Sequence, residues 1–402
     1  METYSAEVAA SRAGVEPQEV VRLTDLGMLG SNAGDGYTDA DVRRIQVVQE
    51  LERSGLPSDA LASLIGDGRL SLEFLDDAGF RAFAALGDVT FAELSERSGV
   101  PIDVLTVLRV AAGGKAAGPD DRVREDELEV LPLVEFQLQL GFRSQAIERA
   151  LRVYGDSLRR VAEAEAEWWH SEVEGQVLAD GGSTSGIAER ARDISPRLSD
   201  ASDRALMAIY HAQQTHVWST NIVDGIAAAL EQAGLHVREE KSPPAMCFLD
   251  VTGYTQLTQE RGDAAAAALA EKLSRIVQRI SVMHGGRPVK WLGDGVMFHF
   301  PDPGQGVAAA IEMVESLAAA GLPPAHVGLH AGPIIVQEGD FYGQTVNLAA
   351  RIGEYARPGE VLVSGAVRER ADASAIDFQP VGEVALKGVS GLVELYSATK
   401  LT

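Results

Sequence analysis

Two consecutive prolines, Pro243 and Pro244, divide this chain into two parts with different apolar patterns. Proline has no backbone N–H and fixes φ, so a regular helix does not run through such a pair. Before the prolines, apolar residues recur at helical spacing, whereas after them short apolar runs alternate with helical stretches. The sequence therefore predicts a helical region over residues 1–241 and a separate α+β domain over residues 242–402.

The α+β domain shows the order strand, helix, strand, strand, helix, strand. Its two central strands meet at Gly293-Asp294 in "PVKWLGDGVMFHF", and Gly-Asp between β-favouring runs is typical of a two-residue hairpin turn that needs a positive φ. This βαββαβ order predicts a ferredoxin-like sheet with helices on one face. The expected elements are a strand at 245–251, a helix at 264–283, a hairpin at 288–300, a helix at 306–321 and a strand at 325–332.

The composition limits the partners of the chain. Its 35 Lys and Arg oppose 59 Asp and Glu, a net charge of −24 that repels nucleic acids and anionic membranes, so an anionic substrate needs metal ions or a local basic pocket. The single cysteine, Cys247, excludes an internal disulfide and is expected to be inert core, as in a reducing compartment. No run approaches the roughly 18 apolar residues of a membrane span, and residues 1–20 lack a signal-peptide core. We expect a soluble, cytoplasmic protein.

The helical region contains an internal repeat with an offset of about 85 residues. "AGVEPQEVVRL" at Ala13 recurs as "SGVPIDVLTVL" at Ser98, and "TDADVRRIQVVQEL" recurs as "REDELEVLPLVEF". We therefore expect one helical repeat in residues 1–78 and a second in 79–165. Residues 166–241 are expected to form a helical linker or dimerisation region with one long helix.

Two carboxylates lie where strands of the α+β domain end or turn. Asp250 in "FLDVTGYT" closes the first strand, and the chain then turns through Gly253 into an expected helix start. A carboxylate for a cation beside free helix-end N–H groups for phosphate suits a metal–polyphosphate complex. Asp294, at the tip of the neighbouring hairpin, would complete a site for two cations. The simpler alternative is that Asp294 is an ordinary turn residue.

A second group of polar residues begins in "EGDFYGQTVNLAARI". Asn347 and Arg351 are four residues apart on one face of an expected helix, so both can reach the same anion. An Arg fork suits a charged phosphate, and Asn adds a neutral donor. Asp340 precedes this helix at a strand end, and Lys387 in "ALKGVSG" stands beside a glycine loop suited to a triphosphate. The alternatives are a surface ion pair for Arg351, a capping role for Asn347 and a solvated Lys387.

Taken together, these motifs resemble the class III nucleotidyl cyclase catalytic domain. The resemblance is carried by Asp250 in "FLDVTGYT", Lys290 and Asp294 in "KWLGDG", Asp340 in "GDFYG", Asn347 and Arg351 in "VNLAAR", and Lys387 in "LKG". All positions that the family needs for full activity are present, which argues against a degenerate copy. The chain departs from the family pattern at Trp291 and Tyr254, where a smaller residue and a phenylalanine are usual.

The resemblance implies a role for each residue. The implied roles are metal binding for Asp250 and Asp294, adenine selection for Lys290 and Asp340, ribose and α-phosphate contacts for Asn347 and Arg351, a terminal-phosphate contact for Lys387, and substrate binding for Thr252, Gly253, Tyr254 and Thr255. The implied cofactors are two Mg²⁺ or Mn²⁺ ions in each active site. A Lys and Asp pair implies ATP, with the lysine buried in its strand to read the purine.

In this family each active site lies between two catalytic domains. The chain has one copy, so the resemblance implies a head-to-tail homodimer with two shared sites. The metal acids would come from one subunit, and the purine-selecting and transition-state residues from the other. The implied reaction is attack of the ribose 3′-oxygen on the α-phosphorus of ATP, which gives 3′,5′-cyclic AMP and pyrophosphate.

The helical region resembles regulatory modules. Its first copy is similar to the winged helix-turn-helix of MerR-type regulators, and its second, with "FAELSERSGVPIDVLTVLRVAAGG", to the N-terminal regulatory region of soluble actinobacterial class III adenylyl cyclases. We therefore expect an all-α regulatory region with two winged-helix-like repeats. Its effector would be acid pH or an apolar small molecule, and His211 and His216 on the long helix are candidate proton sensors.

Charge argues against DNA binding by the first copy. Residues 1–115 carry 10 Lys or Arg and 19 Asp or Glu, a net charge of −9, which is the wrong sign for a surface that follows phosphates. Nucleic acid is therefore an unlikely partner. The alternative that remains open is a nucleotide-sensing transcription regulator that binds DNA through this repeat.

Overall fold

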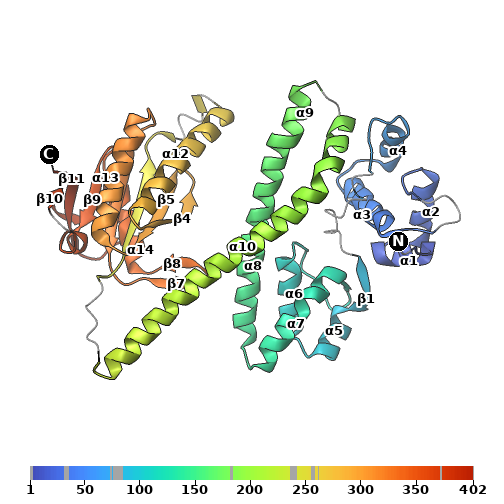
Figure 1. The fold of residues 1–402 in the computed structure, drawn as a ribbon, viewed down its shortest axis with the longest axis horizontal. Helices are drawn as coiled ribbons and strands as arrows, with labels where there is room; N and C mark the ends of the chain where they lie inside the picture. The colour runs from blue at the N-terminus through green and yellow to red at the C-terminus, as the bar shows by residue number, and fades with distance from the viewer. Residues whose placement is uncertain are drawn as a thin grey trace. The chain divides into compact units, whose positions relative to one another are not determined.

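A computed structural model of the chain describes most of its residues. The described residues are 3–30, 36–72, 75, 85–181, 184–235, 242–254, 259–260, 262–371 and 374–401. The chain forms two compact units, Met1–Val223 and Asp224–Thr402, which run from blue to green and from green to red in Figure 1. Within the described part of the chain, no helix is both long and apolar enough to cross a membrane.

The helices of the first unit repeat along the chain. The first set is α1 (Ala6–Ala13), α2 (Pro17–Asp25), α3 (Asp39–Arg53) and α4 (Ser58–Gly66), and the second is α5 (Phe91–Ser98), α6 (Ile102–Ala111), α7 (Glu125–Gln139) and α8 (Ser144–Trp169). Corresponding helices begin 85 or 86 residues apart. Each set has its own buried hydrophobic cluster. The similarity of these repeats to winged helices stays a prediction.

Each repeat has a buried ion pair at the start of its third helix, at equivalent positions. Asp41 and Glu127 occupy the third position of α3 and α7, where each closes a capping box, and both are almost fully buried. Arg44 pairs with Asp41 at 2.8 Å, and Arg109 donates to Glu127 at 2.8 Å. Burial by itself would raise the pKa of Asp41, but hydrogen bonds from Thr38 and from a backbone N–H, together with Arg44, hold it below its usual range.

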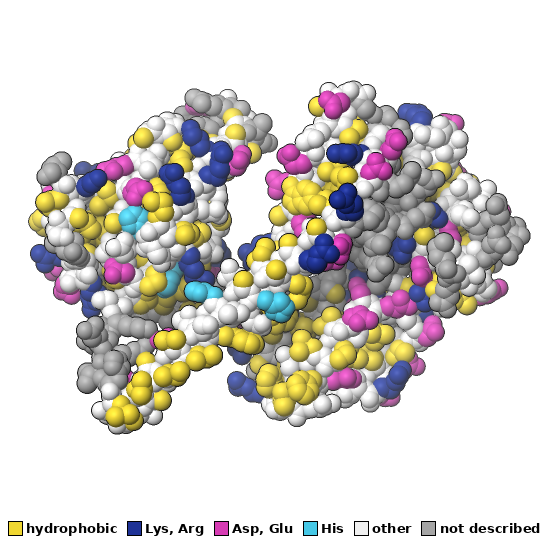
Figure 2. All heavy atoms as spheres, viewed as in Figure 1, with side chains coloured by type: hydrophobic (Ala, Val, Ile, Leu, Met, Phe, Trp, Pro, Cys, Tyr) yellow, Lys and Arg dark blue, Asp and Glu magenta, His cyan; other side chains and the backbone are white. Residues whose placement is uncertain are grey.

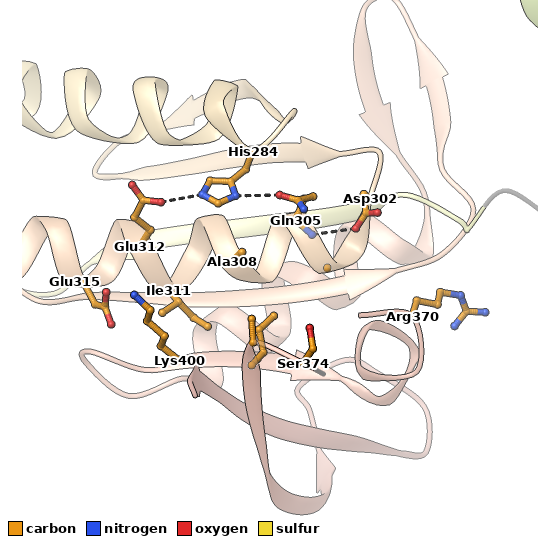
Figure 3. Close-up of a pocket in the computed structure, with 13 residues that line it drawn as sticks. His284, Asp302, Gln305, Ala308, Ile311, Glu312, Glu315, Arg370, Ser374 and Lys400 are labelled. Carbon is orange, nitrogen blue, oxygen red and sulfur yellow. Dashed lines mark hydrogen bonds and ion pairs between the residues drawn. The ribbon is translucent and has the colours of Figure 1, made fainter. Parts of the chain in front are cut away.

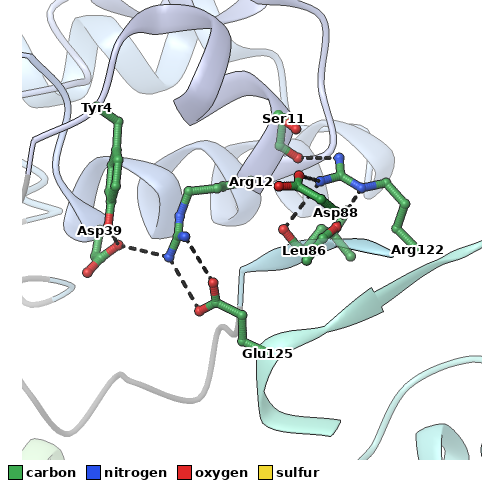
Figure 4. Close-up of polar contacts among 9 residues, drawn as sticks. Tyr4, Ser11, Arg12, Asp39, Leu86, Asp88, Arg122 and Glu125 are labelled. Carbon is green, nitrogen blue, oxygen red and sulfur yellow. Dashed lines mark hydrogen bonds and ion pairs between the residues drawn. The ribbon is translucent and has the colours of Figure 1, made fainter. Parts of the chain in front are cut away.

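The expectation of an all-α first unit is wrong in one detail. Strands β1 (Leu86–Thr90) and β2 (Arg122–Arg124) form a small antiparallel sheet within the second repeat. Arg122 donates to the backbone oxygen of Ser11 at 2.6 Å, and Arg12 bridges Asp39 and Glu125 at 3.3 and 2.9 Å (Figure 4). A strand of three residues has no readable periodicity, and its partner lies far along the chain, so the sequence pattern did not reveal this pair.

The linker after α8 contains the predicted long helix. A π-helical turn, η3 (His170–Glu174), and α9 (Gly175–Ala179) lead to α10 (Thr184–Gln232), a helix of 49 residues. Hydrophobic side chains gather along the second half of α10, where Trp218 and Ile222 are exposed (Figure 2). His211 and His216 are also exposed on this helix.

The second unit is built on a seven-stranded sheet with the order β10-β11-β9-β6-β3-β5-β4. Its elements are β3 (Ala245–Val251), α12 (Asp263–Met283), β4 (Arg287–Leu292), β5 (Gly295–Phe300), α13 (Pro303–Ala319), β6 (Ala325–Ala331), β9 (Val361–Ser364), α15 (Gly365–Arg368), β10 (Ile376–Ala385) and β11 (Leu392–Lys400). The first six confirm the predicted βαββαβ order. Their strands lie side by side as β6-β3-β5-β4, the order of a ferredoxin-like sheet.

Helices cover both faces of this sheet, so the prediction of helices on one face is wrong. Cys247 and Leu249 on β3 belong to the cluster formed with α12 and α13, whereas Met246 on the same strand packs against α14 (Gln344–Tyr355). Cys247 is fully buried and burial raises its pKa strongly, as expected of inert core. A Cβ on Gly328 would lie 2.0 Å from the backbone nitrogen of Gly353, so α14 can pack directly on β6 only because Gly328 lacks a side chain.

Two histidines of the sheet are partly buried and make it sensitive to acid. Burial, and after it the charge of Arg370, lowers the pKa of His330 to about 4, and burial with Arg287 does the same for His299. The unfolded chain has a histidine pKa of about 6.5 and so binds more protons at low pH. We therefore expect the contribution of these two histidines to the stability of the unit to be full above about pH 6.5 and to be lost as the pH drops towards 4.

We expect His330→Asn to weaken this acid sensitivity. His330 Nδ1 lies 2.7 Å from Ser364 Oγ, and an amide keeps a hydrogen-bonding group there without taking up a proton. The loss of stability between pH 7 and 4 should shrink by about 1 to 3 kcal/mol. Hydrogen exchange of the β6 amides at several pH values measures this loss of stability. His216→Asn, on the exposed face of α10, is the control, and an unchanged pH dependence in His330→Asn contradicts the prediction.

Candidate active site

The two predicted metal acids lie at the same end of the sheet. Asp250 is the penultimate residue of β3, and Asp294 follows Gly293 in the turn between β4 and β5. Leu292 pairs with Gly295, which leaves Gly293 and Asp294 as a two-residue turn, and Gly293 has a φ of 69°. A positive φ at the first central position is typical of a primed hairpin turn. The predicted hairpin is therefore confirmed, and its tip projects beside the end of β3 because β3 and β5 are neighbours.

The electrostatics of this pair favour a cation. Burial, and after it the negative charge of Asp294, raises the pKa of Asp250. A Cβ on Gly295 would lie 3.1 Å from Asp250 Oδ1, so glycine leaves that carboxylate edge uncrowded. Two repelling carboxylates are relieved by a divalent ion, and Mg²⁺ commonly takes one or two carboxylates together with phosphate and water oxygens. Among the residues described, no cluster of three or more His, Cys, Asp or Glu could hold a metal by itself.

Sequence reasoning missed His326, which lies beside Asp250. The two residues are register partners on β6 and β3, and His326 Nε2 is 3.5 Å from Asp250 Oδ2. Its other ring nitrogen is 3.2 Å from Thr252 Oγ1, so the imidazole joins two of the predicted site residues. Only the strand register could have revealed this contact, because the two strands are far apart in the sequence.

The loop after Asp250 has mixed roles. The backbone N–H of Thr252 donates to Pro324 at 3.0 Å, and Gly253 is exposed with a φ of 80°. Tyr254 packs against the core and donates its hydroxyl proton to the backbone oxygen of Ala266 at 3.1 Å, which gives it a structural contact. Thr255 and the expected helix start lie outside the described residues.

The predicted purine-selecting residues form an ion pair. Lys290 Nζ donates to Asp340 Oδ2 at 2.7 Å. A bulge between Pro288 and Lys290 shifts the register of β4, so that Lys290 pairs with Met297 and lies on the same sheet face as α14. The expectation that Lys290 is buried is wrong, because β4 is an edge strand and the lysine side chain is 50% exposed. Burial would raise the pKa of Asp340, but the bonds from Lys290 and a backbone N–H lower it.

The predicted transition-state residues lie on α14. Asn347 is exposed, and Arg351 forms an ion pair with Glu354 one turn along at 2.5 Å. The surface ion pair that was the alternative for Arg351 is thus present. Lys387 is exposed in the turn after β10, next to Gly388 with a φ of 73°.

These residues form separate groups within one chain. Across the described ranges, no hydrogen bond or ion pair joins the metal acids to Asp340, to α14, or to Lys387. Within one chain, the two metal acids interact with each other and the purine pair forms its own ion pair.

Two cavities of the second unit differ in how they relate to these residues. A cavity of about 640 Å³ lies on the α13 side of the sheet, where His284 contacts Glu312 at 2.8 Å and Gln305 at 3.1 Å (Figure 3). It contains none of the predicted site residues. A smaller cavity of about 320 Å³ touches Asp294 and is lined by Trp291, whose side chain is therefore not core.

Comparison with known proteins finds a family similar to most of the second unit. Residues 237–399 match the family described as Adenylate and Guanylate cyclase catalytic domain. A pH-sensitive adenylate cyclase of Mycobacterium tuberculosis is 24% identical, over 94% of this chain and 93% of the relative. An adenylate cyclase of Streptomyces coelicolor is 32% identical over 38% of this chain and 40% of its own length.

A solved structure is similar to the same part of the chain. The crystal structure of an adenylyl cyclase from P. aeruginosa is 22% identical, covers 41% of this chain and 98% of that one, and has a TM-score of 0.37. We conclude that residues 237–399 are similar to the catalytic domain of adenylate and guanylate cyclases and that the chain is an enzyme of the adenylate cyclase type.

Proposed function

We propose that this protein converts ATP to 3′,5′-cyclic AMP and pyrophosphate at active sites shared between two subunits. The observation that carries the choice of ATP is the Lys290–Asp340 ion pair at 2.7 Å. A carboxylate accepts a hydrogen bond from the 6-amino group of adenine, whereas guanine offers an oxygen acceptor at that position. Lysine beside it can donate to a ring nitrogen.

Asp250 and Asp294 fit a pair of divalent ions, Mg²⁺ or Mn²⁺. The raised pKa of Asp250, the open edge beside Gly295 and the all-oxygen donor set support this assignment. When bound, such ions lower the pKa of the ribose hydroxyl and neutralise the phosphate oxygens. The two carboxylates hold these charges in place at the end of the sheet.

The remaining residues bind and orient the nucleotide. Asn347 positions the ribose, and Arg351 exchanges its surface ion pair with Glu354 for the α-phosphate, where charge develops. Lys387 contacts the terminal phosphates. Substrate binding by the strand-end loop involves Thr252, Gly253, Tyr254 and Thr255. None of these steps requires covalent attachment to the chain.

A head-to-tail homodimer would bring the separate groups together. One subunit supplies the metal acids, and its partner supplies the purine pair, Asn347 and Arg351.

We further propose that the protein is cytoplasmic and that the helical region regulates catalysis through a proton or an apolar ligand. Support comes from the pH-sensitive relative, which aligns over both units. A pH series of cyclic AMP formation by the full chain tests the proton effector. The comparisons do not favour the alternative of a DNA-binding regulator.

The direct test is to incubate the purified chain with ATP or GTP and Mn²⁺ and to identify the product. We expect cyclic AMP and pyrophosphate from ATP, and little cyclic GMP. Absence of any cyclic nucleotide, or a clear preference for GTP, would contradict the proposal.

Mixing two inactive variants tests whether the sites are shared. Asp294→Ala removes a metal acid and Arg351→Ala removes the phosphate contact, so a mixed dimer keeps one intact site. With random exchange, mixing should restore about a quarter of the activity. Asp250→Ala mixed with Asp294→Ala is the control, because every site then lacks an acid. No recovery in the first mixture, with dimers present, contradicts shared sites.

A further inference from the structure

The segment that carries Asp340 is a small arm held by one buried ring. Strands β7 (Ile335–Gln337) and β8 (Asp340–Tyr342) form their own two-stranded sheet, apart from the seven-stranded one. Within residues 335–342 only Phe341 is buried, at 5% exposure. The position of the arm, and of Asp340 on it, therefore depends on what contacts the Phe341 side chain.

Phe341 belongs to a buried cluster with Met246, Met297 and Ala349, and two polar side chains of the main sheet also contact its ring. The His299 ring stacks on Phe341, with centroids 5.0 Å apart and an angle of 19° between the planes. The Arg287 guanidinium carbon lies 5.3 Å from the centre of the same ring. Arg287 and His299 are register partners on β4 and β5. Because the pKa of His299 is lowered to about 4, its ring is neutral near pH 7 and does not repel the neighbouring arginine.

The backbone N–H of Phe341 links the position of its ring to the orientation of the Asp340 carboxylate. The Phe341 N–H donates to Asp340 Oδ1 at 2.9 Å, and Lys290 Nζ donates to Oδ2 at 2.7 Å. Both carboxylate oxygens are thus oriented, one of them by the residue whose ring is held. Lys290 lies three positions after Arg287 on β4, so one strand pair supports both members of the purine-selecting pair.

We propose that His299, together with Arg287, is a positioning residue for purine selection. It holds Phe341 so that Asp340 presents its free lone pairs to the 6-amino group of the nucleotide. This inference rests on the proposed function of Lys290 and Asp340 in reading the purine. It adds a specificity determinant that does not touch the substrate.

Paired substitutions at His299 in the full-length protein test it. His299→Leu removes the flat ring but keeps an apolar side chain, whereas His299→Phe keeps a ring that can stack. We expect His299→Leu to lower kcat/KM for ATP about tenfold, mainly through KM, and to lower the ATP:GTP ratio of kcat/KM several-fold. His299→Phe should stay within about twofold of the wild type in both.

His330 offers a matched control. It is also a partly buried histidine of the same sheet with a pKa of about 4, but it contacts Ser364 instead of the arm. His330→Leu should reduce stability and leave the ATP:GTP ratio unchanged. If His299→Leu behaves in the same way, its role is packing alone and the proposal is overturned.

Hydrogen exchange of residues 335–342 provides a readout that needs no activity. We expect faster exchange in His299→Leu than in the wild type, and near wild-type exchange in His299→Phe. Unchanged exchange of these residues in His299→Leu overturns the proposal that His299 positions Phe341. If the wild type makes no cyclic nucleotide, the proposed function fails, and the exchange of the arm still decides whether His299 positions it.

Discussion

Asp294→Ala is expected to abolish metal-dependent cyclic AMP formation. The turn between β4 and β5 projects this carboxylate beside Asp250, whose pKa is raised by burial and, after it, by the negative charge of Asp294. With one acid removed, the single remaining carboxylate binds divalent ions too weakly to hold them at the phosphates. Activity with Mn²⁺ and ATP should fall to background, because charge neutralisation at the phosphates contributes several kcal/mol to such reactions.

Metal binding can be followed in the same variant without catalysis. Mn²⁺ should raise the melting temperature of the wild type, since a ligand at about 100 times its Kd stabilises a protein by about 2.7 kcal/mol. Asp294→Ala should lose this shift, whereas Glu383→Ala, which removes an exposed acid on β10, should keep it. A variant that retains both the shift and near-normal activity would show that Asp294 is a turn residue and no more.

Arg351→Ala is expected to lower kcat by about a hundred- to a thousandfold, the usual effect of losing a donor to the transition-state charge. The fold should survive, because an exposed ion pair with a residue one turn away contributes little to stability. Arg351→Lys should recover little, since an ammonium cannot reproduce the two-pronged contact of a guanidinium. Steady-state assays with ATP measure both variants.

Glu354→Gln separates the two roles available to Arg351. If the arginine must leave Glu354 to reach phosphate, removing that negative charge should preserve or raise activity. If the ion pair only stabilises the helix, Arg351→Ala and Glu354→Gln should have similarly small effects, and the proposed role of Arg351 is then wrong.

Local patterns predicted much of the second unit. The Gly293-Asp294 turn follows from glycine's tolerance of positive φ, and the βαββαβ order follows from the change between strand and helix periodicity. The repeat in the first unit could also be read directly, because corresponding helices keep an offset of 85 or 86 residues. These features depend on neighbours close in sequence.

The errors share a different cause. The helix α14 lies on the opposite face from α12 and α13, and this depends on the contact of Gly328 with Gly353 across two elements. The exposure of Lys290 depends on β4 being an edge strand, and its direction depends on a bulge against β5. Neither the sheet order nor a register shift has a signature within a short window of residues.

The sequence by itself determined which residues this protein offers as candidates for binding metal, purine and phosphate, because their types and spacings are local properties. Only the tertiary structure decided which of them meet. It pairs Lys290 with Asp340, sets His326 against Asp250, and stacks His299 on the ring beside Asp340. The physical reason is that these contacts join strands distant along the chain, whose order and register are fixed by packing of the whole unit.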